Sequence, residues 1–261
     1  MRARLVPPRR GPRWLATGWR LFRAAPFGWL LLVIAYWMLM TALSLLPYAG
    51  LGAATLLVPA FSVGFMAASR AAERRQPVEL VQLFAGFRGR FGVQLALGAV
   101  YLASLAGILA ASALADDGAL ALWMVGARRP EEEAVQSGEF LAALGVAAIL
   151  YTPVMMLFWF APVLAAWHGM RAGQALFYSF FASLVNWRAF VTYGAAAMLV
   201  SVVLPFLVLF AIIAATGGAP GPAVRLVFPL LLVLLPTLFA SFYASYRDVF
   251  APGDDTRPEG D

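Results

Sequence analysis

Three hydroxyl side chains near the C-terminal end form the most regular polar pattern in the chain. Thr237, Ser241 and Ser245 follow one another at four-residue spacing, which places them on one face of a helix. Inside a membrane such a row can line a pathway for a neutral or amphipathic substrate, or a groove for a lipid headgroup. It can also join two helices, or bond back to the preceding turn. We favour this second interpretation, because hydroxyl patterns are weakly specific, and we keep the polar lining as the alternative.

The groups needed for acid–base, nucleophilic or metal chemistry are scarce. The chain has one histidine, His168, and no cysteine. A protein metal site needs three or four convergent ligands, and a catalytic triad needs its histidine beside a nucleophile and a carboxylate. The sequence around His168 supplies neither, whereas Gly169 can cap a helix that ends there. We therefore predict a capping or interfacial role for His168, with no catalytic residue, no metal, no cofactor and no enzymatic activity.

Long stretches without a charged side chain predict the helices on which these hydroxyl groups and His168 lie. Of the 261 residues 62% are hydrophobic, and the uncharged stretches are 24–69, 91–115, 140–170, 189–224 and 226–246. A bilayer core requires roughly 20 apolar residues of helix, so the first stretch holds two spans, divided at 47–50. The sequence predicts an all-α, six-span transmembrane helical bundle. The predicted spans are about 28–47, 51–69, 91–115, 142–167, 190–214 and 226–246.

The spans contain no acidic or basic residue. Ionisable groups inside a membrane usually mark proton relays and ion pathways. Their absence argues against a proton-coupled pump and against a transporter with a buried counter-ion. Around the spans we predict a basic N-terminal tail over 1–12, an integral membrane domain over 13–250, and an acidic, disordered tail over 251–261.

Amphipathic stretches carrying aromatic residues and arginine precede the odd-numbered spans, at 14–23, 78–88 and 172–188. Apolar residues on one face and arginine on the other favour helices that lie in the headgroup plane at the cytoplasmic face. The side chains predicted to anchor the protein to lipid headgroups or to the interface are Trp19, Arg20, Arg23, Arg88, Trp187, Arg188 and Arg247. Arg247 ends span six and can reach phosphate, with Asp248 beside it to offset its charge.

The distribution of arginine predicts the orientation. Under the six-span topology sixteen arginines fall on one side and three on the other. Short loops rich in arginine stay cytoplasmic, so we expect both termini in the cytoplasm and the acidic loop 116–141 in the periplasm. Arginines at the inner surface attract anionic lipid by about 1 kcal/mol each. We therefore expect anionic headgroups as partners, and no nucleic acid, because the topology signal already accounts for the basic N-terminus.

Two stripes of small residues and one asparagine predict local packing. Span two has Ala60, Gly64 and Ala68, and span three has Ala99, Ala103, Gly107 and Ala111, all at i, i+4 spacing. Small side chains let membrane helices approach closely, so we expect both stripes to face other helices of the same chain. Asn186 precedes span five and is expected to cap its N-terminus.

Several short strings together carry a family resemblance. They are Gly18-Trp19-Arg20-Leu21-Phe22-Arg23, Leu83-Phe84-Ala85-Gly86-Phe87, Trp159-Phe160-Ala161-Pro162, Asn186-Trp187 and Ala244-Ser245-Tyr246-Arg247-Asp248-Val249-Phe250. Over about 13–250 the chain resembles an uncharacterised family of proteobacterial multi-pass inner-membrane proteins, which implies that location and fold. More distantly, its architecture is similar to the membrane domain of some glycerophosphoryl diester phosphodiesterases, although their catalytic domain has no counterpart here.

These observations lead to one expected function and one alternative. We expect a non-enzymatic protein of the bacterial inner membrane that organises or assists a lipid partner or a membrane protein partner. The alternative is a transporter or lipid-handling protein for a neutral or amphipathic substrate.

Overall fold

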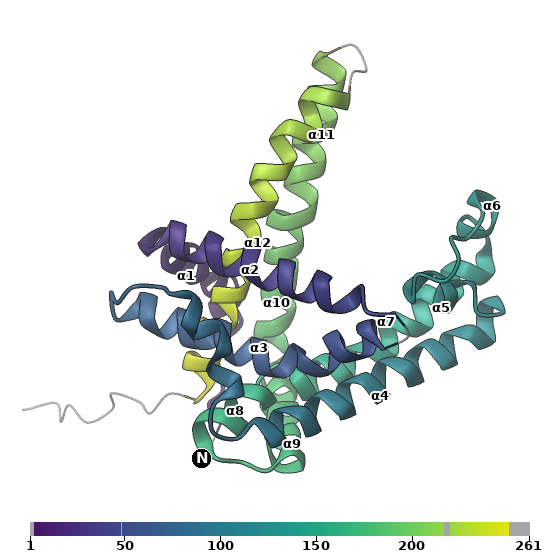
Figure 1. The fold of residues 1–261 in the computed structure, drawn as a ribbon. Coiled ribbons are helices and arrows are strands. Elements are labelled where there is room, and N and C mark those ends of the chain that lie inside the picture. Colours follow the sequence, from purple (N-terminus) through teal and green to yellow (C-terminus); the bar gives the residue numbers. More distant parts are fainter. Residues whose placement is uncertain (1–2, 48, 217–219, 251–261) are drawn as a thin grey trace, which may run out of the picture. The chain divides into compact units, whose positions relative to one another are not determined.

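The computed structural model describes residues 3–47, 49–216 and 220–250, and the side chains within that part except those of 220–231. The predicted acidic tail 251–261, the turn at 217–219, Tyr48, Arg2 and the Arg225 side chain lie outside the described residues. The described secondary structure is helical throughout (Figure 1). In chain order the helices are η1 (Pro8–Arg10), α1 (Gly11–Ala24), α2 (Pro26–Ser44), α3 (Gly50–Glu73), η2 (Leu80–Phe87), α4 (Phe91–Asp116), α5 (Ala119–Met124), α6 (Glu132–Val135), α7 (Gly138–Phe158), α8 (Ala161–His168), α9 (Ala172–Val185), α10 (Trp187–Met198), η3 (Leu199–Val203), α11 (Leu204–Ala215) and α12 (Pro220–Phe250).

Five helical segments among the described residues are long and apolar enough to cross a membrane. They are Pro26–Ser44, Gly50–Glu73, Phe91–Asp116, Gly138–His168 and Trp187–Ala215, at the positions of the first five predicted spans. The sixth predicted span, 226–246, falls within α12, whose first part has no described side chains. An all-helical, multi-span architecture is therefore confirmed, and the count of six stays a prediction.

The fourth of these segments is interrupted between α7 and α8. The break leaves backbone groups without helical partners, and such groups need other partners inside a membrane. Ser179 of α9 provides them, because its Oγ accepts a hydrogen bond from the Phe160 N–H at 2.9 Å and donates one to the Met156 carbonyl at 2.8 Å. Gly169 then ends α8 with a left-handed φ of 65°. The predicted cap after His168 is confirmed, and His168 itself is exposed.

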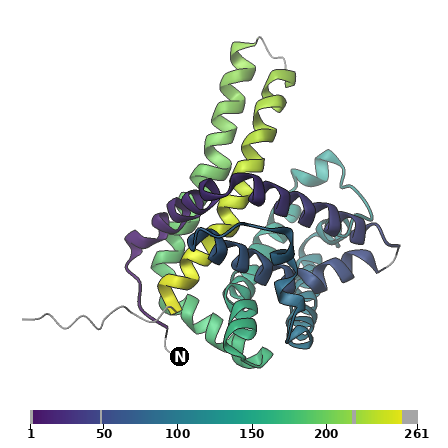
Figure 2. The same ribbon diagram turned by 60° about the vertical axis from the view of Figure 1, so that its left-hand side comes forward.

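The chain divides into two compact units. The first comprises the described residues of Met1–Ala35, Phe65–Leu83 and Ala182–Asp261. Its centre is α1, which packs against α12 and α10. Figure 2 shows α11 and α12 side by side in this unit, running in opposite directions.

Helix α1 of the first unit is amphipathic, with a buried apolar face and an exposed basic face. It buries Trp14, Leu15, Leu21 and Phe22, whereas its arginines are exposed. Trp14 packs against Phe190 and Tyr193 of α10, with ring centroids 5.3 and 5.8 Å away. These aromatic contacts fix the position of α1 on α10.

Glycine permits the close approach of α1 to its neighbours. A Cβ atom on Gly18 would overlap the carbonyl oxygen of Thr237 in α12 and would lie 2.9 Å from the Ser241 nitrogen. A Cβ atom on Gly11 would similarly overlap the carbonyl oxygen of Ala189 in α10. Backbone therefore meets backbone at both crossings, as small residues allow in membrane proteins.

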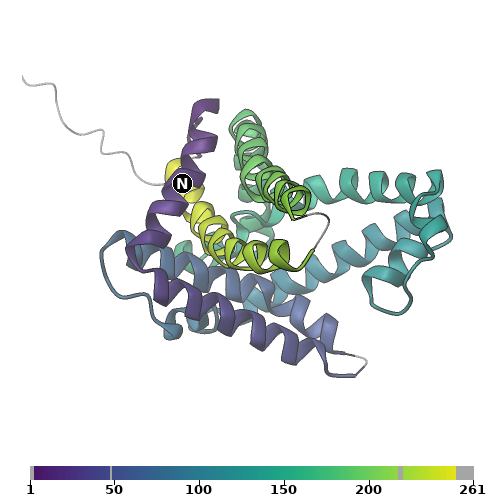
Figure 3. The same cartoon turned by 90° about the horizontal axis from the view of Figure 1, so that it is seen from above.

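The second unit comprises Tyr36–Gly64 and Phe84–Phe181. Its main contact joins α4 to α7, which lie side by side in Figure 3. The hydroxyls of Tyr101 and Tyr151 are 3.2 Å apart across this contact. Gln94 is buried and donates a hydrogen bond to the Pro162 carbonyl at 2.9 Å, which ties α4 to the start of α8.

The two predicted stripes of small residues differ in outcome. Ala60, Gly64 and Ala68 are buried in α3, as expected. In α4 the prediction was wrong, because Ala99, Ala103 and Gly107 are exposed and a Cβ on Gly107 would meet nothing. The face of α4 that is buried instead carries Gln94, Leu97, Gly98, Ile108 and Ser112. Alanine and glycine are so frequent in α4 that i, i+4 spacing occurs on more than one face, so the stripe did not identify the interface.

Candidate functional site

The N-terminal segment packs against α10 and α12 within the first unit and leads into Arg10, the first arginine of the site. Asn186 holds this segment, because its Oδ1 accepts from the Val6 N–H at 2.7 Å and its Nδ2 donates to the Arg4 carbonyl at 2.9 Å. The Arg4 N–H in turn donates to the Val249 carbonyl at 3.0 Å, and the Thr192 hydroxyl donates to the Pro8 carbonyl at 2.6 Å. The backbone of residues 4–8 is thereby fixed.

The predicted capping role of Asn186 was wrong. Asn186 occupies the N-cap position of α10, but its side chain makes no capping hydrogen bond. Its amide also donates to the Ala182 carbonyl at 2.9 Å, so both ends of the side chain are already engaged. A buried asparagine satisfies its donors and acceptor wherever partners are available, and here the distant N-terminal segment supplied them.

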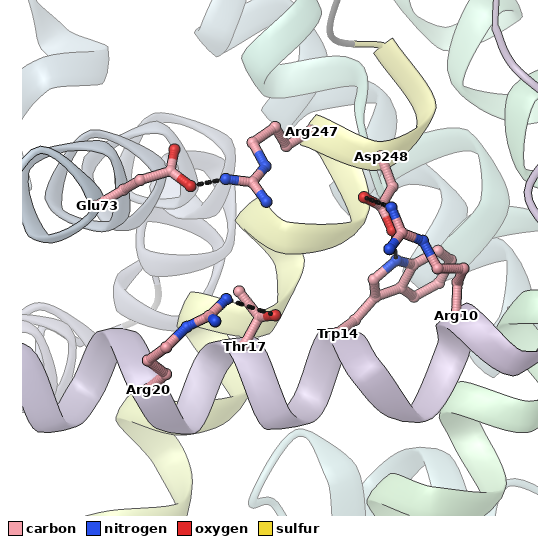
Figure 4. Close-up of polar contacts among 7 residues, drawn as sticks. All are labelled: Arg10, Trp14, Thr17, Arg20, Glu73, Arg247 and Asp248. Atoms are coloured by element: carbon pink, nitrogen blue, oxygen red, sulfur yellow. Dashed lines mark hydrogen bonds and ion pairs between the residues drawn. The ribbon is translucent and has the colours of Figure 1, made fainter. Parts of the chain in front are cut away.

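An arginine-lined pocket of about 320 Å³ lies between α1 and the last turns of α12. Its lining residues are Arg10, Arg13, Trp14, Ala16, Thr17, Arg20, Ala244, Arg247 and Asp248. In Figure 4 the labelled α1 side chains point toward the end of α12. Arg10, Arg13, Thr17 and Arg20 follow one another at spacings of three, four and three residues, which keeps them on one helical face.

Asp248 joins the two walls of this pocket. Its Oδ1 accepts from the Arg10 guanidinium at 3.0 Å, and its Oδ2 accepts from the Trp14 indole N–H at 2.7 Å (Figure 4). The Asp248 side chain is only 12% exposed, and Trp14 is buried. Partly buried, charge-assisted bonds are stronger than exposed ion pairs, so this cluster holds α1 against α12.

Arg247 on the opposite wall pairs with Glu73 at the end of α3, not with Asp248 as predicted. The other carboxylate oxygen of Glu73 accepts from the Tyr243 hydroxyl at 2.6 Å. Sequence reasoning missed Glu73 because the two partners lie far apart along the chain. It misassigned Asp248 because adjacent residues on a helix project in different directions.

Arg13 and Arg20 have no carboxylate partner among the described residues. Within the described part of the chain, Arg20 donates a hydrogen bond only to the Thr17 hydroxyl, at 3.3 Å and within the same helix. The pocket therefore presents two guanidinium groups whose charge the described side chains do not balance. Guanidinium groups bind phosphate and carboxylate oxygens through paired hydrogen bonds.

The lining is suited to binding an anion. It contains no histidine, cysteine or lysine, and its one carboxylate is already bonded to Arg10 and Trp14. In the described part of the chain, no group of three or more His, Cys, Asp or Glu could hold a metal ion. The arrangement can thus hold a phosphate in place, but it offers no evident base or nucleophile to attack one.

The predicted interface anchors are divided among several places. Arg20 and Arg247 come together in the pocket. Trp19 and Trp187 are about half exposed, and an arginine lies over each ring. The Arg23 guanidinium is 6.0 Å from the Trp19 ring centroid, and the Arg188 guanidinium is 5.5 Å from the Trp187 ring centroid. Arg88 is exposed after η2. Such aromatic–arginine pairs are typical of headgroup depth, and their role as anchors stays a prediction.

The hydroxyl row of α12 lies under α1. Thr237, Ser241 and Ser245 are buried, and each donates to a carbonyl of the preceding turn, at 2.9, 2.6 and 2.7 Å. Ser241 also shares a 2.7 Å hydrogen bond with the Tyr193 hydroxyl of α10. These contacts agree with a helix-joining role, and the polar lining stays a prediction.

Long apolar helices with largely exposed side chains define a multi-pass helical membrane protein. A protein of Burkholderia thailandensis that bears the name "Probable inner membrane protein" is 37% identical over 260 residues, which covers 97% of this chain and 96% of that protein. The chain belongs to the family of this inner-membrane protein, as the sequence resemblance predicted. No protein-family profile and no solved structure matches the chain.

Proposed function

We propose that this protein is a non-enzymatic, six-span component of the inner membrane that binds the phosphate of an anionic lipid headgroup in the arginine-lined pocket. In doing so it organises lipid at the cytoplasmic face. The observation that carries the proposal is the pair Arg13 and Arg20, which line the pocket without a carboxylate partner among the described residues.

The proposed orientation brings the pocket to a suitable depth. With both termini in the cytoplasm, α1 precedes the first span and the pocket residues of α12 follow or end the sixth. Both walls then lie near the inner headgroup layer, where the surface potential of anionic lipid favours arginine. The exposed Trp19 and Trp187 are typical of the same layer.

The pocket also has a suitable size and rigidity. Its volume of about 320 Å³ lies at the lower end of small-molecule sites, about 300–1,000 Å³. That volume accommodates a headgroup, while acyl chains would remain in the bilayer. Asp248 and Glu73 hold Arg10 and Arg247 in place, so fewer side chains have to be ordered on binding.

Lipid retention tests the proposal. The protein is purified in a mild detergent, and the lipids that remain bound are identified by native mass spectrometry. The wild type should retain anionic phospholipid, and Arg13→Gln with Arg20→Gln should lose most of it, since each charged hydrogen bond contributes about 1.5–3 kcal/mol. Arg9→Gln is the matched control, because Arg9 is exposed and does not line the pocket. Equal retention by all three proteins would refute the proposal.

Reporter fusions test the orientation separately. Fusions after Arg75, Arg171 and Arg257 should report a cytoplasmic location, and fusions near Tyr48, Glu132 and Gly218 a periplasmic one. A periplasmic signal after Arg75 would overturn either the span count or the orientation, and an inverted orientation would place the pocket away from the cytoplasmic leaflet.

A further inference from the structure

We infer that the pocket selects a phosphomonoester dianion over the phosphodiester of ordinary anionic phospholipids. This inference rests on the proposed function, because it names the ligand class of the same pocket. The ligand is a terminal phosphate group, carried either by a lipid or by a soluble molecule.

Three donors of α1, Arg13, Thr17 and Arg20, line the pocket within two turns of the helix. Thr17 lies four residues after Arg13 and three before Arg20, so the hydroxyl is flanked by one arginine on the turn before and one on the turn after. The Arg20 guanidinium already reaches the Thr17 hydroxyl at 3.3 Å. Two guanidinium groups and one hydroxyl that line one pocket of about 320 Å³ are suited to one phosphate, and less well to two phosphates held apart.

The number of available oxygens favours a terminal phosphate. A phosphomonoester has three terminal oxygens, and these can accept from Arg13, Arg20 and Thr17 together. A phosphodiester has only two non-bridging oxygens, and its second substituent must occupy the space of the third. Arg10 and Arg247 also line the pocket and are held by carboxylates, so that substituent has to share the pocket with charged groups.

Charge balance points in the same direction. Arg10 is paired with Asp248 and Arg247 with Glu73, which leaves the charges of Arg13 and Arg20 to the ligand. At neutral pH a phosphomonoester carries about 1.5 to 2 negative charges. It therefore matches the two guanidinium groups, whereas a phosphodiester leaves one of them unbalanced.

Calorimetric titration of the detergent-purified, full-length protein tests this selectivity. The probes are dioctanoyl phosphatidate, dioctanoyl phosphatidylglycerol and glycerol 3-phosphate. At about pH 7.5 phosphatidate should bind about tenfold more tightly than phosphatidylglycerol. The preference should shrink to within about threefold near pH 5.5, because the second phosphate proton returns with a pKa near 6.

Variants separate the outcomes. Arg13→Gln with Arg20→Gln should weaken phosphatidate binding by about tenfold or more and remove its pH dependence, whereas Arg9→Gln should change neither. If the wild type bound both lipids equally and the double variant bound neither, the selectivity would be refuted and the proposed function would stand. If the double variant bound both lipids like the wild type, the pocket itself would be refuted.

The soluble probe identifies the source of the phosphate. Glycerol 3-phosphate that binds as tightly as phosphatidate, with the same dependence on Arg13 and Arg20, would assign the pocket to a soluble phosphomonoester. Phosphatidate that binds much more tightly would assign it to a lipid. In either case the ligand is a phosphomonoester dianion. Tighter binding of phosphatidylglycerol than of phosphatidate at about pH 7.5 would overturn that conclusion.

Discussion

Replacing Gly18 by alanine should separate α1 from α12 and open the arginine-lined pocket. The added Cβ would overlap the Thr237 carbonyl oxygen and would lie 2.9 Å from the Ser241 nitrogen. Both atoms belong to the helix backbone, so no side-chain rotation can relieve the contact. The axis of α1 has to move outward by several tenths of an ångström, and the Arg10–Asp248 and Trp14–Asp248 bonds are lengthened with it.

The expected loss of stability combines two opposing effects. Overpacking costs about 1–3 kcal/mol, and contact with a rigid backbone places Gly18→Ala near the upper limit. Alanine in place of helical glycine returns about 1 kcal/mol. The net loss is therefore roughly 2 kcal/mol, and binding of anionic lipid should weaken because the pocket walls no longer meet.

Thermal unfolding in detergent, followed by tryptophan fluorescence, measures this effect. Gly194→Ala is the matched control, since Gly194 is exposed in α10 of the same unit and a Cβ there would meet nothing. Gly194→Ala should leave the unfolding midpoint unchanged or raise it slightly, while Gly18→Ala lowers it by several degrees. If both variants unfolded at the wild-type temperature, the packing of α1 on α12 would be wrong.

Three further perturbations test other contacts. Asn186→Ala should cost about 1–3 kcal/mol and speed tryptic cleavage after Arg4 and Arg9, because it removes the bonds to Val6 and Arg4 that hold the backbone of this segment. Unchanged cleavage would contradict the docking of this segment. Ala103→Leu and Gly107→Leu should be tolerated, whereas Gly98→Leu should reduce the folded yield, since a Cβ at Gly98 would overlap the Leu56 carbonyl. Equal folded yields of all three variants would refute the assignment of the buried face of α4. Single cysteines at 237, 241 and 245 should resist an impermeant maleimide, because these positions are buried; labelling of all three would favour the transport alternative.

Much of the helical architecture could be predicted from the sequence because membrane spans are encoded locally. An uncharged apolar stretch of sufficient length has to satisfy its own backbone, so helices α2, α3 and α4 follow directly from the hydropathy pattern. The break between α7 and α8 was harder to predict. Pro162 disfavours a continuous helix at this point, but the partner that stabilises the break, Ser179, comes from a different helix.

The pocket could be predicted only in part because its contacts are nonlocal. The spacing of Arg10, Arg13, Thr17 and Arg20 along one face was available in the sequence, and Arg247 was recognised as a phosphate ligand candidate. The pairing of Asp248 with Arg10 and of Glu73 with Arg247 depends on which helices pack together. No local pattern specifies that, and the exposed stripe of α4 shows the same limit.

Locating the lipid phosphate in the folded protein tests the central proposal most directly. A crystal structure of the protein grown with its co-purified lipids would provide this measurement. We predict phosphate oxygens within hydrogen-bonding distance of the Arg13 and Arg20 guanidinium groups and the Thr17 hydroxyl. Lipid phosphates found only around the outside of the helices, with the pocket filled by the protein's own side chains, would contradict the proposed function.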